Sequence, residues 1–161
     1  MLVEKGSAIT QERGPYSYRA DPRVPKFPDD HPIVIFDGIC VLCSGSATFV
    51  LRHDKRQRFR LLTAQSALGH ALYLHYGLDP QDYETMILLA DGVAHFKSEA
   101  GIRIAEGLGL PWSLAAAFRI LPRGLRDRLY DRIARNRYRL FGKRDRCYVA
   151  SEADRSRFLA F

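Results

Sequence analysis

Two cysteines separated by two residues are the part of this sequence best suited to chemistry. Cys40 and Cys43 lie in the run FDGICVLCSGS, after a short apolar, β-branched stretch and at the start of a helical pattern. A helix N-terminus favours a thiolate, because free backbone N–H groups and the positive end of the helix dipole face the sulfur. We therefore expect Cys40 to be an exposed nucleophile and Cys43, one turn further along, to be the shielded resolving thiol of a disulfide exchange.

The same pair has two alternative interpretations. Free cysteines are often small buried core residues, and a zinc site would need further ligands at suitable spacing. The remaining candidate ligands form no second closely spaced pair; they are His53, His70, His75, His95 and Cys147. We therefore prefer thiol–disulfide chemistry, which requires no organic cofactor and no metal because the two cysteines carry the electrons.

Asp37, three residues before Cys40, is the third candidate site residue. Its carboxylate could accept or relay a proton when Cys43 is deprotonated. A charge this close would also raise the pKa values of the thiols. Alternatively, Asp37 and Gly38 form a turn in which the carboxylate holds backbone amides of the loop. The two roles are compatible, and the sequence does not choose between them.

Strands and helices alternate in the pattern around these residues. Apolar runs predict strands at 33–36, 59–63, 85–90 and 93–96, and helical spacing predicts helices at 40–54, 66–76 and 98–107. Ser98 offers a hydroxyl cap for the last helix. Asp91-Gly92 is the dipeptide that a two-residue type I′ hairpin requires, because both residues need positive φ.

This order of elements indicates an α/β fold with a thioredoxin-like three-layer core and a mixed four-stranded sheet. Strand–helix–strand connections within one sheet are parallel, so we expect two parallel pairs and one antiparallel edge strand. Five prolines before residue 33 make residues 1–31 an extended or disordered N-terminal arm. Residues 32–109 would form the core, and residues 110–161 a C-terminal helical extension packed on it.

The extension is expected to contain a long helix from about residue 124 to residue 141. An apolar stripe should dock this helix on the core; it comprises Leu125, Leu129, Ile133, Ala134, Tyr138 and Phe141. The region between Arg119 and Arg146 holds ten arginines and one lysine against three aspartates, so it carries all of the chain's net charge of +7.

Four of these arginines share one side of the long helix: Arg128, Arg132, Arg135 and Arg139. The preferred interpretation is a solvated face with some arginines paired to Asp127 and Asp131. The alternative is a non-catalytic binding protein that uses this face for an anionic partner, with the cysteines structural or metal-bound. No pattern of a specific nucleic-acid reader supports nucleic acid as that partner.

Cys147 lies within this basic region, in the run KRDRCYV. If the tail folds back over the first helix, Cys147 could be a resolving or regulatory thiol whose pKa is lowered by its cationic neighbours. The preferred alternative is an inert cysteine packed under Tyr148.

Length and composition limit the class of protein. With 161 residues, of which 47% are apolar and 27% charged, the chain suits one soluble domain. Three cysteines cannot all pair, which excludes a small secreted disulfide scaffold. The N-terminus lacks a signal-peptide pattern, and no apolar run reaches the 18 residues of a membrane span. We therefore expect a cytoplasmic protein.

The run FDGICVLCSGS resembles the DCC family of thiol-disulfide oxidoreductases, named for an Asp-x-x-Cys-x-x-Cys signature on which Asp37, Cys40 and Cys43 fall. Other segments between about residues 32 and 150 resemble the family too: Lys97 to Ala100, Leu121 to Arg123, Tyr130, Ala134 to Tyr138, Phe141-Gly142 and Cys147. The resemblance implies a thioredoxin-like fold and dithiol–disulfide exchange with a protein or low-molecular-weight thiol, maintained by an external thiol reductant.

The sequence departs from true thioredoxins at two places. Thioredoxins have a cis-proline just before the third strand, whereas Thr85 precedes Met86 here. The residues between the cysteines are Val41 and Leu42 in place of the usual Gly-Pro. Substrate engagement and redox potential are therefore expected to differ, and metal binding is less firmly excluded.

Overall fold

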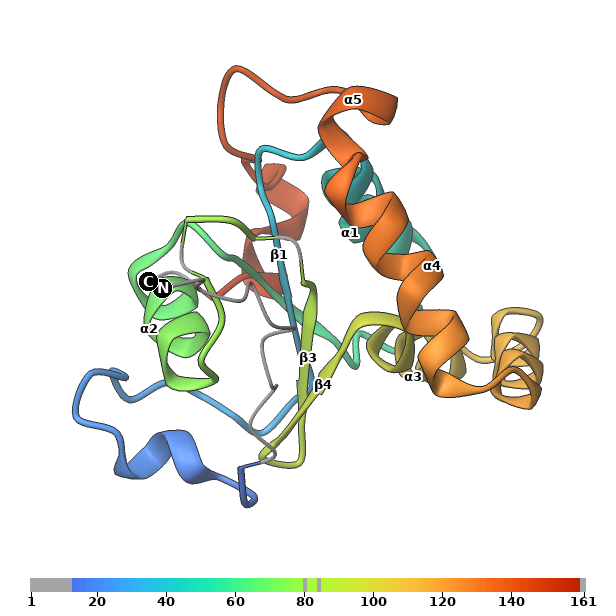
Figure 1. Ribbon diagram of the computed structural model, residues 1–161. Helices are drawn as coiled ribbons and strands as arrows, with labels where there is room; N and C mark the ends of the chain where they lie inside the picture. The colour runs from blue at the N-terminus through green and yellow to red at the C-terminus, as the bar shows by residue number, and fades with distance from the viewer. Residues whose placement is uncertain (1–12, 80, 84, 160–161) are drawn as a thin grey trace, which may run out of the picture.

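The computed structural model describes residues 13–79, 81–83 and 85–159 (Figure 1). Its centre is a mixed four-stranded sheet in the order β2-β1-β3-β4. The strands are β1 (Ile33–Phe36), β2 (Arg60–Thr63), β3 (Ile87–Ala90) and β4 (Val93–Phe96). All four predicted strands are confirmed. The fold is the expected thioredoxin-like α/β fold.

Helices cover both faces of the sheet. They are α1 (Val41–His53), α2 (Ala67–His75) and α3 (Lys97–Leu108). On one face, Ile33 and Ile35 pack with Leu68 and Leu72 of α2. On the other face, Val34 packs with side chains of α1 and α3. Figure 1 shows α2 on one side of the sheet and α1 with α3 on the other. The continuous apolar run of β1 thus reflects burial on both faces.

Strand direction differs from the expectation of two parallel pairs, which is wrong. β1 is parallel to β2, but β3 is antiparallel to both β1 and β4. A parallel β3 would have to begin where α2 ends. β3 instead begins at the other end of β1 and runs antiparallel to it. The predicted hairpin is confirmed, with φ of 51° at Asp91 and 76° at Gly92.

The cap predicted for α3 is wrong. This helix begins at Lys97, has no side-chain cap, and ends before Gly109 with φ of 79°. The Ser98 hydroxyl donates to Asp127 of the next long helix. A tertiary contact has therefore taken the side chain that local geometry would have used as a cap.

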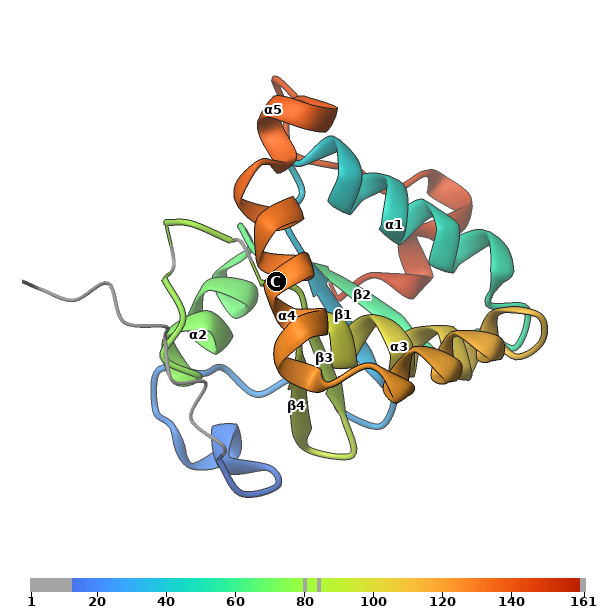
Figure 2. The same ribbon diagram turned by 45° about the vertical axis from the view of Figure 1, so that its right-hand side comes forward.

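The C-terminal extension contains η2 (Trp112–Ile120), α4 (Arg123–Arg135), α5 (Arg137–Phe141) and η3 (Glu152–Arg157). The single helix predicted over 124–141 is therefore wrong, because Asn136 interrupts it with φ of −103° and ψ of 6°. The interruption changes the direction of the chain. As a result, α5 lies beside the start of α1 in both views (Figures 1 and 2).

The predicted docking stripe of α4 is also largely wrong. Leu125, Leu129 and Ile133 remain 45–52% exposed, and only Ala134 of the same helix is fully buried. The helix is held by polar contacts instead: Lys97 Nζ lies 2.9 Å from an Asp131 oxygen, and Arg126 lies 3.5 Å from Glu99. These ion pairs to α3 turn the apolar stripe toward solvent.

Both chain ends contribute to the core. In the N-terminal region, η1 (Ser17–Ala20) carries Tyr18, which is buried against the α2 side of the sheet. Residues 1–12 of the predicted arm lie outside the described residues. At the other end, Arg157 pairs with the buried Asp54 at 2.5 Å. Within the described part of the chain, no helix combines the length and apolarity that a bilayer span needs.

Candidate active site

The cysteine pair occupies the junction between β1 and α1. Cys40 is the N-cap residue of α1, with extended backbone angles, and its Sγ accepts a hydrogen bond from the backbone N–H of Cys43 at 3.3 Å. Both cysteines are free thiols. The sulfur of Cys40 therefore receives one of the unpaired N–H groups of the helix start, as the sequence predicts.

The exposure of the two thiols is the reverse of the prediction. Cys40 has no exposed surface, and Cys43 is partly exposed. Residues 142–148, which we call the C-terminal strap, cover Cys40. The strap runs along the 38–41 loop, where Arg144 N donates to Ile39 O and Tyr148 N donates to Gly38 O, both at 2.7 Å. Backbone pairing of this kind leaves little trace in side-chain patterns.

The two thiols have opposite pKa shifts. The pKa of Cys40 falls to about 6, because the hydrogen bond from the Cys43 thiol, the Cys43 backbone N–H and the charge of Arg137 outweigh burial and the charge of Asp37. The pKa of Cys43 rises, because its thiol is engaged with Cys40 and because burial and Asp37 disfavour its charge. These opposite shifts favour Cys40 as the thiolate and Cys43 as the protonated partner.

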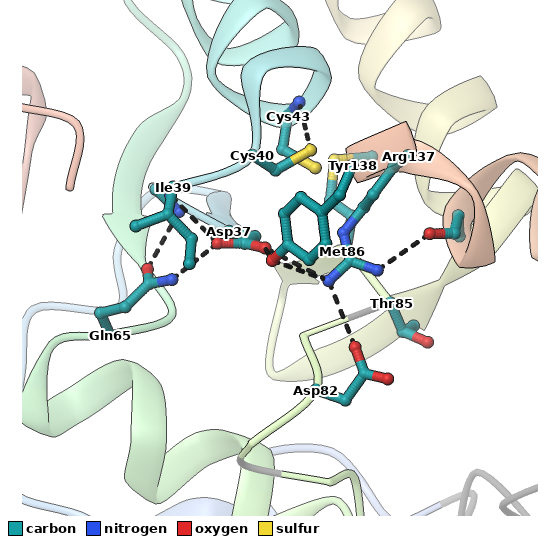
Figure 3. Close-up of polar contacts among 12 residues, drawn as sticks. Asp37, Ile39, Cys40, Cys43, Gln65, Asp82, Thr85, Met86, Arg137 and Tyr138 are labelled. Atoms are coloured by element: carbon teal, nitrogen blue, oxygen red, sulfur yellow. Dashed lines mark hydrogen bonds and ion pairs between the residues drawn. The ribbon is translucent and has the colours of Figure 1, made fainter. Parts of the chain in front are cut away.

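Asp37 is at the centre of a polar cluster behind the thiols (Figure 3). It is only 1% exposed. Its Oδ1 accepts from the Ile39 backbone N–H at 3.0 Å and from Gln65 Nε2 at 2.6 Å. The loop-holding contact predicted from the Asp-Gly turn is thus present. Its predicted role in proton transfer to or from Cys43 remains a prediction.

The second oxygen of Asp37 faces α5, a hundred residues away in the sequence. Tyr138 donates its hydroxyl to Oδ2, and the buried Arg137 guanidinium lies 3.3 Å from the same atom. Arg137 also contacts Asp82 at 3.2 Å. Burial and Asp37 together raise the pKa of Tyr138. Sequence reasoning did not assign Gln65, Arg137 or Tyr138 to the site; the signal for the last two was the segment 134–138 that resembles the family.

Cys147 lies on the strap near this cluster. A Cβ added at Gly38 would come within 2.5 Å of Cys147 Sγ, so the tail does fold back onto the loop. The lowered pKa expected for Cys147 is wrong: burial raises it. Burial outweighs the lowering effect of Arg144, whose side chain lies over the ring of Tyr148, and Lys143 lies over the ring of Tyr138.

The segment before β3 shows what replaces the cis-proline of thioredoxins. Met86 N donates to the Tyr130 hydroxyl at 3.0 Å, and the Thr85 carbonyl accepts from the Tyr73 hydroxyl. These two backbone groups are therefore already bonded inside the protein.

The arginine face of α4 and α5 is exposed. Asp127 pairs with Arg123 and Asp131 pairs with Lys97. Among the described residues, no carboxylate contacts the four arginines predicted to share this face: Arg128, Arg132, Arg135 and Arg139. As for the zinc alternative, no group of three His, Cys, Asp or Glu side chains with metal-binding geometry occurs in the part of the chain that the structure describes.

Comparison with known proteins gives a consistent set of matches. Residues 34–143 match the model of a family described as DCC1-like thiol-disulfide oxidoreductase. Uncharacterized protein YuxK of Bacillus subtilis (strain 168) is 34% identical over 127 residues, covering 79% of this chain and 93% of that protein. DCC family protein At1g52590, chloroplastic, of Arabidopsis thaliana is 38% identical over 120 residues, covering 74% of this chain and 70% of that protein. No solved structure matches the chain significantly.

Proposed function

The chain belongs to the DCC1-like thiol-disulfide oxidoreductase family, and from this premise we propose that Cys40 and Cys43 exchange electrons with a disulfide substrate. One observation carries the proposal: Cys40 Sγ lies at the start of α1 and accepts the backbone N–H of Cys43 at 3.3 Å, an arrangement that lowers the pKa of Cys40 while the pKa of Cys43 is raised. A nucleophile and a resolving thiol need this asymmetry.

In the proposed reaction, movement of the partly exposed Cys43 side chain uncovers Cys40 Sγ, and the Cys40 thiolate attacks one sulfur of the substrate disulfide. A mixed disulfide forms and the first substrate thiol leaves. Cys43 then loses its proton and attacks Cys40 Sγ, which closes the Cys40–Cys43 disulfide and releases the second substrate thiol. Two electrons and two protons pass to the substrate. An external dithiol reductant reverses the change in the protein, so no organic cofactor is needed.

Asp37 is proposed as a positioning residue that also receives the proton of Cys43. It fixes the 37–39 turn through the Ile39 N–H, and Arg137 and Tyr138 fix its carboxylate in turn. Since a buried carboxylate with several donors is held in one orientation, it keeps the same position relative to the two thiols in every cycle.

The test is exchange activity with dithiothreitol as the electron source and a disulfide substrate. Cys40→Ser should lose exchange, and Cys43→Ser should stop at the mixed disulfide, which mass spectrometry detects as an adduct. Cys147→Ser is the matched control and should keep the wild-type rate. Wild-type rates in both variants of the pair would refute the proposal. A thiol count and the redox potential of the pair complete the test.

A second candidate function rests on the exposed arginines and the exposed apolar side chains of α4. Such a surface could bind an anionic partner. Binding of this kind predicts salt-dependent retention on heparin that survives Cys40→Ser but weakens when Arg132 and Arg135 are replaced by Ala. Retention that does not depend on salt, or that survives those replacements, would refute it.

The compartment is proposed to be the cytoplasm, where glutathione and thioredoxin systems keep thiols reduced. The Arabidopsis relative carries the word chloroplastic in its name. Fractionation of cells that express a tagged chain would test the location.

A further inference from the structure

An apolar groove of about 560 Å³ lies between α1 and α3 and extends to Cys43. Cys43 and Met86 line the groove at the end nearest the thiols, and Phe49, Ile104, Leu108 and Phe141 are among the side chains along it. None of the described residues that line it carries a charge. Both helices cover the same face of the sheet (Figure 2). The exposed thiol therefore opens into a site that favours apolar groups.

Two helical glycines keep this groove open. Gly45 of α1 and Gly101 of α3 both line it, and a Cβ added at either would meet no atom within 4 Å. Glycine inside a helix is unfavourable relative to alanine. Neither position has a positive φ or a close neighbour that would require glycine. Packing of the fold thus does not account for these two residues, whereas free space for a ligand does.

The structure also disfavours a protein chain as the occupant. A peptide that added itself as a strand beside Thr85 and Met86 would need backbone groups that Tyr73 and Tyr130 already occupy. The C-terminal strap, residues 142–148, covers the loop that a protein substrate would have to contact. A small molecule that enters along α1 and α3 avoids both obstacles.

We propose that this groove binds the apolar arm of a small, uncharged disulfide or dithiol, which is the substrate of the exchange. This inference rests on the proposed function. A groove volume of several hundred Å³ fits a ligand of this size. A charged ligand such as glutathione would lose its hydration there without gaining an ionic partner.

Dihydrolipoamide and dihydrolipoate are suitable probes, because they share a dithiol and an alkyl arm and differ only in a terminal amide or carboxylate. In the test, the oxidised protein is mixed with either dithiol. The first thiolate of the probe attacks one sulfur of the Cys40–Cys43 disulfide, which breaks that bond, forms a mixed disulfide with the probe and releases the first protein thiol. The second thiolate of the probe attacks the probe's own sulfur in this mixed disulfide, which closes the cyclic disulfide and releases the second protein thiol. Two electrons and two protons pass to the protein. Alkylation and mass spectrometry of the protein report the rate.

The expected result is a rate constant at least about tenfold higher for dihydrolipoamide than for dihydrolipoate, which corresponds to about 1.4 kcal/mol. Gly101→Leu fills the groove and should remove most of that advantage. It should leave the rate with dithiothreitol, a compact dithiol without an arm, within about twofold of wild type. Leucine is a better helix former than glycine, so the variant should fold.

Gly124→Leu is the matched control, because Gly124 is also a helical glycine with open space around a Cβ but lies on α4, away from the groove. Equal rates for the two probes, or an unchanged advantage in Gly101→Leu, would overturn the inference. If the reduced protein reduces the disulfides of insulin faster than lipoamide, and Gly101→Leu loses this preference, the groove binds a protein substrate. That result would overturn the inference as well. If no dithiol, dithiothreitol included, reduces the protein, the proposed function itself fails.

Discussion

Replacement of Asp37 by asparagine tests the polar cluster behind the thiols most directly. The carboxylate is buried, and four donors converge on it, from Ile39, Gln65, Arg137 and Tyr138. Asparagine keeps the shape and one acceptor oxygen. It removes the charge that balances Arg137 and places an N–H₂ group where two donors already point.

The expected loss of stability follows from these contacts. Removing one partner of a buried ion pair typically costs about 3–5 kcal/mol. Arg137 retains Asp82 at 3.2 Å, a carboxylate that is half exposed, so the lower end of that range applies. We therefore expect Asp37→Asn to lower the free energy of unfolding by about 3 kcal/mol. At about 2 kcal/mol per molar urea, the unfolding midpoint should fall by about 1.5 M.

Urea unfolding of the reduced protein, followed by circular dichroism, measures this change. Asp82→Asn is the matched control. It removes the exposed partner of the same arginine and should cost less than about 1 kcal/mol. A loss below about 1 kcal/mol for Asp37→Asn, or an equal loss in the two variants, would show that the cluster does not hold the loop as argued.

The same variant has an electrostatic consequence at the thiols. The charge of Asp37 raises the pKa of Cys40 and that of Arg137 lowers it. Without the carboxylate, the thiolate of Cys40 should form at a lower pH than the wild-type value of about 6. A midpoint that moved upward would contradict this assignment of charges.

Three further predictions concern the thiolate, the N-terminal region and the C-terminus. The absorbance of the Cys40 thiolate should titrate with a midpoint near pH 6, and Cys40→Ser should abolish this titration. Between about pH 6 and 9 the unfolded chain still binds the proton that folded Cys40 has lost, so the free energy of unfolding should rise with pH over this range. A free energy of unfolding that does not change over this range would contradict the lowered pKa. Gly92→Ala should lower the free energy of unfolding, measured by urea denaturation, by about 1–3 kcal/mol, because φ at this position is positive and the new Cβ would meet the Tyr16 ring. An unchanged unfolding midpoint would refute that packing. Arg157→Met should lower the free energy of unfolding by about 3 kcal/mol, because it leaves Asp54 buried without its cation. A loss below about 1 kcal/mol would refute a stabilising role for this ion pair.

Local patterns in the sequence were sufficient for the strands and for the position of the thiols. An apolar run followed by Asp-Gly ends β1, and a helical pattern places Cys40 at the first turn of α1. Both depend on neighbours within a few residues, as does the positive φ of the Asp91-Gly92 hairpin. Such features are decided by backbone sterics and by periodicity, so they can be read without knowledge of the fold.

Apart from the local break of the predicted long helix at Asn136, the failures involve partners distant in the sequence. The direction of β3 is seen only in its antiparallel pairing with β1, and the exposed stripe of α4 depends on ion pairs to α3. Ser98 could have capped α3, but a distant carboxylate was available to it. Periodicity identifies the apolar face of a helix, but it does not show whether ion pairs to another element will turn that face toward the core or toward solvent.

The sequence by itself therefore determined the chemistry that is available: two thiols, one helix start and one nearby carboxylate. Only the tertiary structure decided how these groups are set. The strap buries Cys40, α5 delivers Arg137 and Tyr138 to Asp37, and α1 with α3 leaves an apolar groove beside Cys43. The physical reason is that burial and pKa depend on every group within a few ångströms, and here those groups come from segments up to a hundred residues apart.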